Sequence, residues 1–318
     1  MSSISPSHSV RAYAPGGIGN MGPGLDILGC AVTGAGDAVE LEWSDDTQMT
    51  GLRVEDAGHP DLPTDPARHA AAIAALRVLH ASGLRPARAL VMRVRKGLPV
   101  AGGQGGSAAS AVAGAVAMNE LLGAPLNQNA LLVAALDAEA AVAGRHADNV
   151  AASLLGGVVL VRSVDPLDIV RLPFPPALQV VLVHPDQRLR TAEARAILPS
   201  TIDLQTLVRQ SANIAAIVAA LASGDYELLR RALDDRVAEP ARAPLLPGFA
   251  EAKAAALAAG ALGCSISGSG PTIFAFAPND EEGRIIARAM CAAYGARGID
   301  ATSRVGHIDQ QGARLLLS

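Results

Sequence analysis

Four glycines crowd into five positions of the segment Leu98–Ser110, which reads LPVAGGQGGSAAS. A run of small, helix-compatible residues follows directly from Ser107. Glycine lets backbone N–H groups converge without Cβ clashes, and the unpaired amides at a helix N-terminus attract an anion. The segment therefore predicts a phosphate-binding loop in which the hydroxyls of Ser107 and Ser110 could contact phosphate or Mg²⁺. The alternative is a plain glycine-rich turn before a buried helix.

This glycine segment differs from the two common phosphate loops. A Walker loop needs a lysine directly after its last glycine, and none stands there. A dinucleotide-binding loop needs a third glycine, but Ala108 occupies that position. If the chain binds a nucleotide, it does so through another kind of loop.

Composition excludes several classes of protein. The 318 residues carry a formal net charge of −4, which argues against a nucleic-acid partner. Half of the residues are hydrophobic, which excludes a disordered chain, and no uncharged apolar stretch reaches a length of about 18, so we expect no membrane span. The first residues contain no apolar signal core, and the three cysteines lie far apart without metal-type pairing. We therefore expect a cytoplasmic protein.

Strand and helix patterns alternate without the regular rhythm of a doubly wound sheet, which predicts an α+β fold with two layers in each half. Four prolines between residues 166 and 176 place a domain boundary there, giving domains 1–168 and 169–318. Segment 15–29 is predicted to be a glycine-broken loop. The predicted strands are 8–13, 37–43, 88–95, 157–162, 178–183, 272–277, 301–305 and 313–317, and the predicted helices include 67–82, 127–143, 191–197, 204–222, 225–238, 249–262 and 281–295.

Two polar segments in the first half are candidates for a site. Asn20 and Asp26 stand among glycines in segment 14–29, where a ligand can approach closely. An ordinary turn capped by the Asn or Asp side chain would show the same sequence pattern. His146 and Asn149 follow an apolar helix that also carries Glu139, which is typical of a helix end that faces a ligand. A lone histidine is more often structural, so it is the grouping of His146 with Asn149 and Glu139 that indicates a site.

The second half adds three more candidates. Thr191 and Arg195 are one helical turn apart and share a face, and Arg242 stands in a proline-rich elbow over residues 239–249. Arginine binds carboxylates through paired donors, but each arginine alone could equally be a solvated surface group. Segment Ser265–Thr272 could be a simple hairpin, could close over phosphates, or could stabilise the first glycine loop.

Together these segments resemble the GHMP small-molecule kinases, and within them the homoserine kinase branch. Residues 14–29, 99–109 and 267–271 match the three family motifs in order. The segment HADNV over 146–150 and the pattern T-x-x-x-R-x-x-L-P over 191–199 are similar to the homoserine branch in particular. The resemblance implies a domain related to the second domain of ribosomal protein S5, a ferredoxin-like second domain, and a site between them.

The resemblance also implies ATP and Mg²⁺ as cofactors, L-homoserine as the phosphoryl acceptor and a homodimer. It places Asn20, His146 and Asn149 around the reacting groups, Asp26 on the substrate ammonium, and Arg195 and Arg242 on its carboxylate, with Thr191 lining the pocket. Ser107 and Glu139 are implied as metal ligands. The implied ATP-binding residues are Pro99, Gly102, Gly103, Gln104, Gly105, Gly106, Ser107, Ala108, Ala109 and Ser110.

The chain departs from the family pattern in its glycine loop. Gln104 replaces an apolar residue and Gly106 replaces a serine, which removes a hydroxyl and adds flexibility. No Asp–Lys pair that could act as a general base is evident in the sequence. Two alternatives therefore stay open: a kinase for another small hydroxylated acid, and a non-catalytic protein that senses a ligand.

Overall fold

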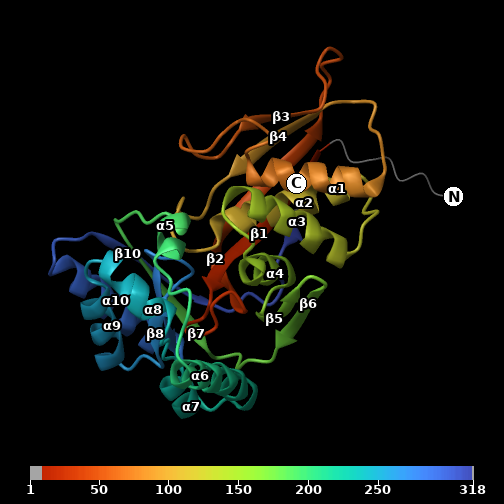
Figure 1. The fold of residues 1–318 in the computed structure, drawn as a ribbon. Coiled ribbons are helices and arrows are strands. Elements are labelled where there is room, and N and C mark those ends of the chain that lie inside the picture. Colours follow the sequence, from red (N-terminus) through yellow and green to blue (C-terminus); the bar gives the residue numbers. More distant parts are fainter. Residues whose placement is uncertain (1–8, 317–318) are drawn as a thin grey trace.

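The computed structural model describes residues 9–316, which form two β-sheets, each packed against helices (Figure 1). This confirms the predicted α+β class. The elements of the first part are β1 (Ser9–Gly19), β2 (Leu28–Trp43), β3 (Leu52–Asp56), α1 (Ala70–Ser82), β4 (Leu90–Arg95), α2 (Gly106–Leu121), α3 (Gln128–Val142), α4 (Ala147–Leu155), β5 (Val158–Val164) and β6 (Leu167–Leu172). Those of the second are β7 (Gln179–Pro185), α5 (Thr191–Ala196), α6 (Leu204–Ser223), α7 (Tyr226–Ala232), α8 (Ala238–Arg242), η1 (Ala243–Leu245), α9 (Phe249–Ala258), β8 (Cys264–Ile266), β9 (Ile273–Ala277), α10 (Asp280–Gly295), β10 (Ala301–His307) and β11 (Arg314–Leu315).

The first sheet has the strand order β11-β1-β2-β4-β3, and the β5–β6 hairpin joins it through β2. All pairs are antiparallel except β3 with β4. Helices α1 to α4 pack against this sheet and share with it the largest buried apolar cluster. The glycine loop therefore lies between strand β4 and helix α2, at one end of this helical layer (Figure 1).

The glycine-broken loop that the sequence predicts over 15–29 is shorter in the structure, where only residues 20–27 lie outside the strands. Strand β1 continues to Gly19 and β2 begins at Leu28. A Cβ at Gly17 would lie 2.1 Å from the carbonyl oxygen of Cys30, and a Cβ at Gly29 would lie 2.1 Å from that of Asp148. The glycines that read as strand breakers are the points where neighbouring backbones approach each other most closely.

Small residues also explain how α2 is buried. Six of its alanines are fully buried, and a Cβ at Gly114 would lie 2.3 Å from the carbonyl oxygen of Ala71 in α1. Alanine favours the helix and costs no side-chain entropy, so a helix of small residues can be enclosed by α1, α3 and the sheet. Asn127 caps α3 by accepting a hydrogen bond from the Ala130 N–H at 3.0 Å, where the predicted helix 127–143 begins.

The second sheet has the antiparallel order β10-β7-β9-β8, and its chain order of strand, helices, two strands, helix, strand is ferredoxin-like. Alternate residues of β7 point to opposite faces. Val181 and Val183 pack with α9 and α10, whereas Val180 and Leu182 pack with α6 and with Ile18 of β1. The second apolar cluster therefore contains residues from both halves of the molecule and joins them.

Several chain segments differ from their predicted extents. The boundary at residue 168 stays a prediction; β6, which pairs with β5, runs to Leu172, and β11 returns to the first sheet. Helix α7 ends at Ala232 rather than 238, because Asp235 accepts backbone hydrogen bonds that begin α8. The sequence analysis missed β3, α4 and β6. The predicted strands 8–13 and 313–317 each extend beyond the described residues.

Helix α6 differs from the sequence expectation in one respect. By length and composition alone, and within residues 9–316, it is long and apolar enough to cross a membrane. However, Gln210 and Asn213 of this helix are buried and bonded to the segment before α8, at 2.9 Å to Asp235 Oδ1 and 2.7 Å to Asp234 O. These contacts make α6 part of the second half's packing.

Candidate active site

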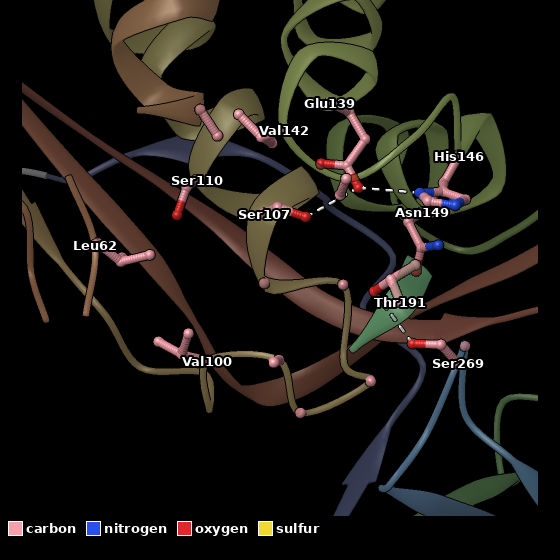
Figure 2. A pocket seen from close by; sticks show the side chains of 18 of the residues that line it. Leu62, Val100, Ser107, Ser110, Glu139, Val142, His146, Asn149, Thr191 and Ser269 are labelled. Carbon is pink, nitrogen blue, oxygen red and sulfur yellow. Dashed lines mark hydrogen bonds and ion pairs between the residues drawn. The ribbon is translucent and has the colours of Figure 1, made fainter. Parts of the chain in front are cut away.

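A cavity of about 520 Å³ brings together the glycine loop, the α3–α4 junction, α5, Arg242 and the turn at Gly268. Leu62, Val100 and Val142 lie toward one end, and His146, Asn149 and Thr191 lie toward the other (Figure 2). The candidate residues that line it are Asn20, Asp26, Pro99, Gly102, Gly103, Gly105, Gly106, Ser107, Ser110, Glu139, His146, Asn149, Thr191, Arg195 and Arg242. Gln104, Ala108 and Ala109 do not line it and are buried behind it.

The glycine loop ends at Gly105, which caps α2 in the left-handed conformation with φ of 68°. No side chain caps the helix and none of its own first-turn residues is acidic, so its first amides are not capped by a side chain of the helix. A Cβ at Gly103 would lie 2.6 Å from the carbonyl oxygen of Ser267. This position therefore admits only glycine without a backbone shift.

Segment Ser265–Thr272 joins the antiparallel strands β8 and β9 as a hairpin and also supports the glycine loop, so two of the three interpretations left open by the sequence hold together, and closure over phosphates stays a prediction. Ser267 Oγ donates to Gly103 O at 2.7 Å, and the Thr272 N–H donates to Gly102 O at 3.3 Å. Ser269, at the tip of the turn, contacts Thr191 Oγ1 at 3.3 Å across the cavity (Figure 2). The turn thus fixes the loop from the second half while lining the site.

Glu139 is the centre of a buried polar cluster. Its Oε1 accepts from Ser107 Oγ at 2.9 Å and lies 3.3 Å from His146 Nδ1 (Figure 2). Its Oε2 is buried and has no hydrogen-bond partner within the described chain. Burial alone would lower the pKa of His146, but the hydrogen bond and charge of Glu139 outweigh it and raise that pKa. A buried carboxylate oxygen without a partner is an open position for a cation.

The charged candidates Asp26, Arg195 and Arg242 are arranged differently from the expectation drawn from the sequence. Arg195 donates to both oxygens of Asp26, at 2.6 and 3.0 Å, so two side chains expected on opposite ends of a ligand touch each other. Arg242 is 3% exposed and donates to two carbonyls, Ala194 O at 3.1 Å and Gly268 O at 2.9 Å. Among residues 9–316 it has no carboxylate partner, and burial lowers its pKa. Its charge is therefore not neutralised, which suits an anionic ligand.

Asn20 connects the first motif to the rest of the site. It adopts a left-handed φ of 71°, its Nδ2 donates to Gly268 O at 2.9 Å, and its Oδ1 accepts from the Asp26 N–H at 3.0 Å. Its own N–H donates to Asp148 Oδ2 at 3.0 Å. Asp148 is buried, and burial together with the nearby charge of Asp26 raises its pKa to about 6. Sequence reasoning counted Asp148 in the polar HADNV segment but gave it no role of its own.

An ion pair behind the glycine loop was also missed. Lys96 pairs with the fully buried Asp37, and Lys96 Nζ donates to Gly106 O and Ser110 Oγ, both at 3.0 Å. Ser110 Oγ donates to Asp37 Oδ2 at 2.6 Å. The chain thus holds an Asp–Lys pair that the sequence did not reveal, because Asp37 lies in β2 and Lys96 directly follows β4, 59 positions away. Its contacts place it at the start of α2.

Comparison with known proteins identifies the family. The family described as "GHMP kinases N terminal domain" matches residues 69–157, and "GHMP kinases C terminal" matches residues 217–296. A homoserine kinase of Chlorobium phaeovibrioides is 43% identical over 97% of this chain and 99% of its own. The chain belongs to the homoserine kinase family.

Other members of the homoserine kinase family agree in sequence and structure. The Arabidopsis thaliana homoserine kinase is 42% identical over 98% of this chain and 85% of its own. The crystal structure of a homoserine kinase from Cytophaga hutchinsonii has a TM-score of 0.94 at 40% identity, covering 99% of this chain and all of that one. These matches confirm the two-domain GHMP kinase fold that the resemblance implied.

Proposed function

We propose that this homoserine kinase family member transfers the γ-phosphoryl group of ATP to the side-chain hydroxyl of L-homoserine, giving O-phospho-L-homoserine, a step of threonine biosynthesis. One observation carries the proposal. A single cavity holds a free helix N-terminus at the glycine loop and, opposite it, the buried Arg242 guanidinium beside Asp26 and Arg195. The first suits a triphosphate and the second suits an amino acid that carries one positive and one negative charge.

ATP binding is supported by the backbone of the glycine loop. The amides from Gly105 to Ser107 would hold the phosphates, and the apolar end near Leu62, Val100 and Val142 would take the base. The side chains of Gln104, Ala108 and Ala109 do not line the cavity, so they would not touch the nucleotide themselves. The hydroxyl of Ser110 is bound to Asp37, so it would support the loop from behind.

Mg²⁺ binding is supported by Ser107 and Glu139. Among residues 9–316 no group of three His, Cys, Asp or Glu side chains could hold a metal ion, so a Mg²⁺ ion at these two residues would need further ligands from phosphate and water. The unpartnered Glu139 Oε2 and the neighbouring Ser107 hydroxyl are hard oxygen donors. When bound there, the cation would neutralise phosphate charge.

Homoserine would be oriented by charge. Arg242 is held by two carbonyls and would be the fixed anchor for the substrate carboxylate. Arg195 is 45% exposed at its side chain and bonded to Asp26, so it must release at least one of those bonds to reach the carboxylate. Asp26 is then available for the ammonium. Substrate binding would thus replace the Arg195–Asp26 ion pair by two pairs with homoserine, Arg195 with its carboxylate and Asp26 with its ammonium.

Asn20, His146 and Asn149 would line the space around the hydroxyl and the phosphoryl group, with Thr191 at its edge. Phosphoryl transfer through a loose transition state depends mainly on positioning and charge neutralisation. The site therefore needs no strong general base.

The direct test is ADP release from ATP and Mg²⁺ with and without L-homoserine. We expect homoserine-dependent turnover in the wild type, and its collapse in Arg195→Ala. Arg188→Ala is the matched control, because Arg188 is 84% exposed at its side chain and lies outside the cavity. Turnover with another small hydroxylated acid but not with homoserine would overturn the proposed substrate.

We also infer a homodimer in the cytoplasm. Around the start of α6, Leu204, Leu207 and Val208 are exposed, Leu204 to 74%, and a second copy would cover them. Cys30, Cys264 and Cys291 form no disulfide, which suits a reducing compartment. Light scattering of the wild type and of Leu204→Asp tests the dimer; a monomeric wild type would contradict it.

A further inference from the structure

Gln104 is the one residue among 102–106 that is not a glycine, and its side chain does not line the cavity. It is 6% exposed. Its Nε2 donates to Thr272 Oγ1 at 3.2 Å, and its Oε1 accepts from Arg304 Nη2 at 2.9 Å. Its backbone carbonyl accepts from the Gly17 N–H at 3.1 Å. One residue therefore connects the loop to β1, to the segment before β9, and to β10.

The bond to Arg304 matters because this arginine lacks a counter-charge. Its Nη1 donates to the Thr33 carbonyl at 2.6 Å, and within the described chain it forms no ion pair with a carboxylate. Burial lowers its pKa. Hydrogen bonds from a charged donor are stronger than neutral ones, and a buried charged donor without an acceptor is costly. Gln104 Oε1 supplies one of two acceptors that make this partly buried cation tolerable.

The bond from Gln104 to Thr272 is linked to His184 of the second sheet through the threonine hydroxyl. Because Gln104 Nε2 donates to Thr272 Oγ1, the threonine hydroxyl is free to donate to His184 Nδ1, 3.0 Å away on β7. Burial lowers the pKa of His184, which keeps an unprotonated ring nitrogen available as the acceptor. The amide group thus fits in one orientation, with its oxygen on Arg304 and its nitrogen on Thr272.

We propose that Gln104 is a positioning residue for ATP, which fixes the glycine loop against the second sheet so that the first amides of α2 face the triphosphate. The loop's four glycines cost entropy when they are ordered, and two side-chain hydrogen bonds at its centre remove part of that freedom before ATP arrives. This explains why the chain functions with a polar residue where the family pattern has an apolar one. The inference rests on the proposed function only in taking ATP as the ligand.

The test measures ATP affinity directly, by calorimetry with Mg²⁺ and without homoserine, on the full chain. Gln104→Leu is expected to weaken ATP binding about tenfold, because it removes both anchoring bonds. Gln179→Leu is the matched control: Gln179 is 3% exposed, bonds to His307 Nδ1 at 2.9 Å in the same sheet, and does not line the cavity. We expect this control to lower the melting temperature while leaving ATP affinity within twofold of the wild type.

Arg304→Met tests the same contact from its other side. It should also weaken ATP binding, and the double variant should bind no more weakly than Gln104→Leu alone, since the two substitutions remove one shared contact. Thr272→Val replaces Gln104→Leu if that variant does not fold. Unchanged ATP affinity in the loop variant, or losses that multiply in the double variant, would overturn the proposal. Absence of homoserine turnover in the wild type would count against the proposed function only, because ATP binding is measured without an acceptor.

Discussion

Where we propose that the phosphates bind, the cavity offers backbone from one continuous segment, whereas the proposed acceptor end consists of charged side chains from segments far apart in the sequence. The glycine loop and the start of α2 offer amides between residues 102 and 107. At the other end, Asp26, Arg195 and Arg242 come from the β1–β2 connection, α5 and α8. A backbone site tolerates changes of side chain but not of φ, and a side-chain site behaves in the opposite way. Substitutions can therefore separate the two ends.

The largest expected effect is at the acceptor end. Arg242→Met should lower kcat/KM for homoserine by about 1000-fold, because losing one partner of a buried charge pair costs roughly 2–5 kcal/mol. ATP affinity should not change, since Arg242 contacts Ala194 and Gly268 rather than the glycine loop. Steady-state kinetics with each substrate varied in turn checks both statements. Equal losses for homoserine and ATP would show that the two ends are not separable.

A smaller loss is expected where the two ends meet. Glu139→Gln should reduce kcat on the order of 100-fold and raise the Mg²⁺ concentration needed for activity, because a neutral amide binds a cation less well than a carboxylate. It should also lower the pKa of His146, which Glu139 raises. Asp137→Asn on the same helix is the control, since Asp137 does not line the cavity. A Mg²⁺ dependence like that of the wild type would remove Glu139 from the metal site.

At the nucleotide end, backbone conformation should decide the outcome. Gly103→Ala should weaken ATP binding about tenfold and lower the melting temperature, because φ is 75° and the new Cβ would lie 2.6 Å from Ser267 O. In Gly123→Ala, φ is 82° but no atom lies within 4 Å, so this variant carries the φ strain alone. Calorimetry should find ATP affinity unchanged in the second variant. Equal effects of both would mean that the close approach to the turn is unimportant.

A final effect concerns the stability of the fold rather than binding or turnover. The pKa of Asp148 is about 6 against an ordinary value of 3.8, so the folded state binds more protons than the unfolded state between those values. Its contribution to stability is therefore lost as pH rises through that window, by up to about 3 kcal/mol. Asp148→Asn should become more stable relative to the wild type as pH rises from 4 to 7, as measured by urea unfolding. A pH-independent difference would show that Asp148 is readily charged in the folded protein.

The acceptor-end side chains could be named from the sequence because motif residues stand in short, recognisable segments. Thr191 and Arg195 share one helical turn, and both line the cavity as that spacing predicts. Their contacts could not be read in the same way. Nothing local indicates that Arg195 binds Asp26, or that Lys96, just after β4, pairs with Asp37 of β2.

The sequence by itself determined the glycine loop, the helix that follows it, and the α+β class, because glycine clusters, caps and hydrophobic spacing act over a few residues. It did not determine strand β1 beyond Pro15, since glycines break an isolated strand but allow close packing in a folded one. Only the tertiary structure decided that Arg195 bonds to Asp26, 169 positions away, and that Gln104 bonds to Arg304, 200 positions away. Such contacts depend on how two sheets pack against each other, and no short-range pattern records that packing.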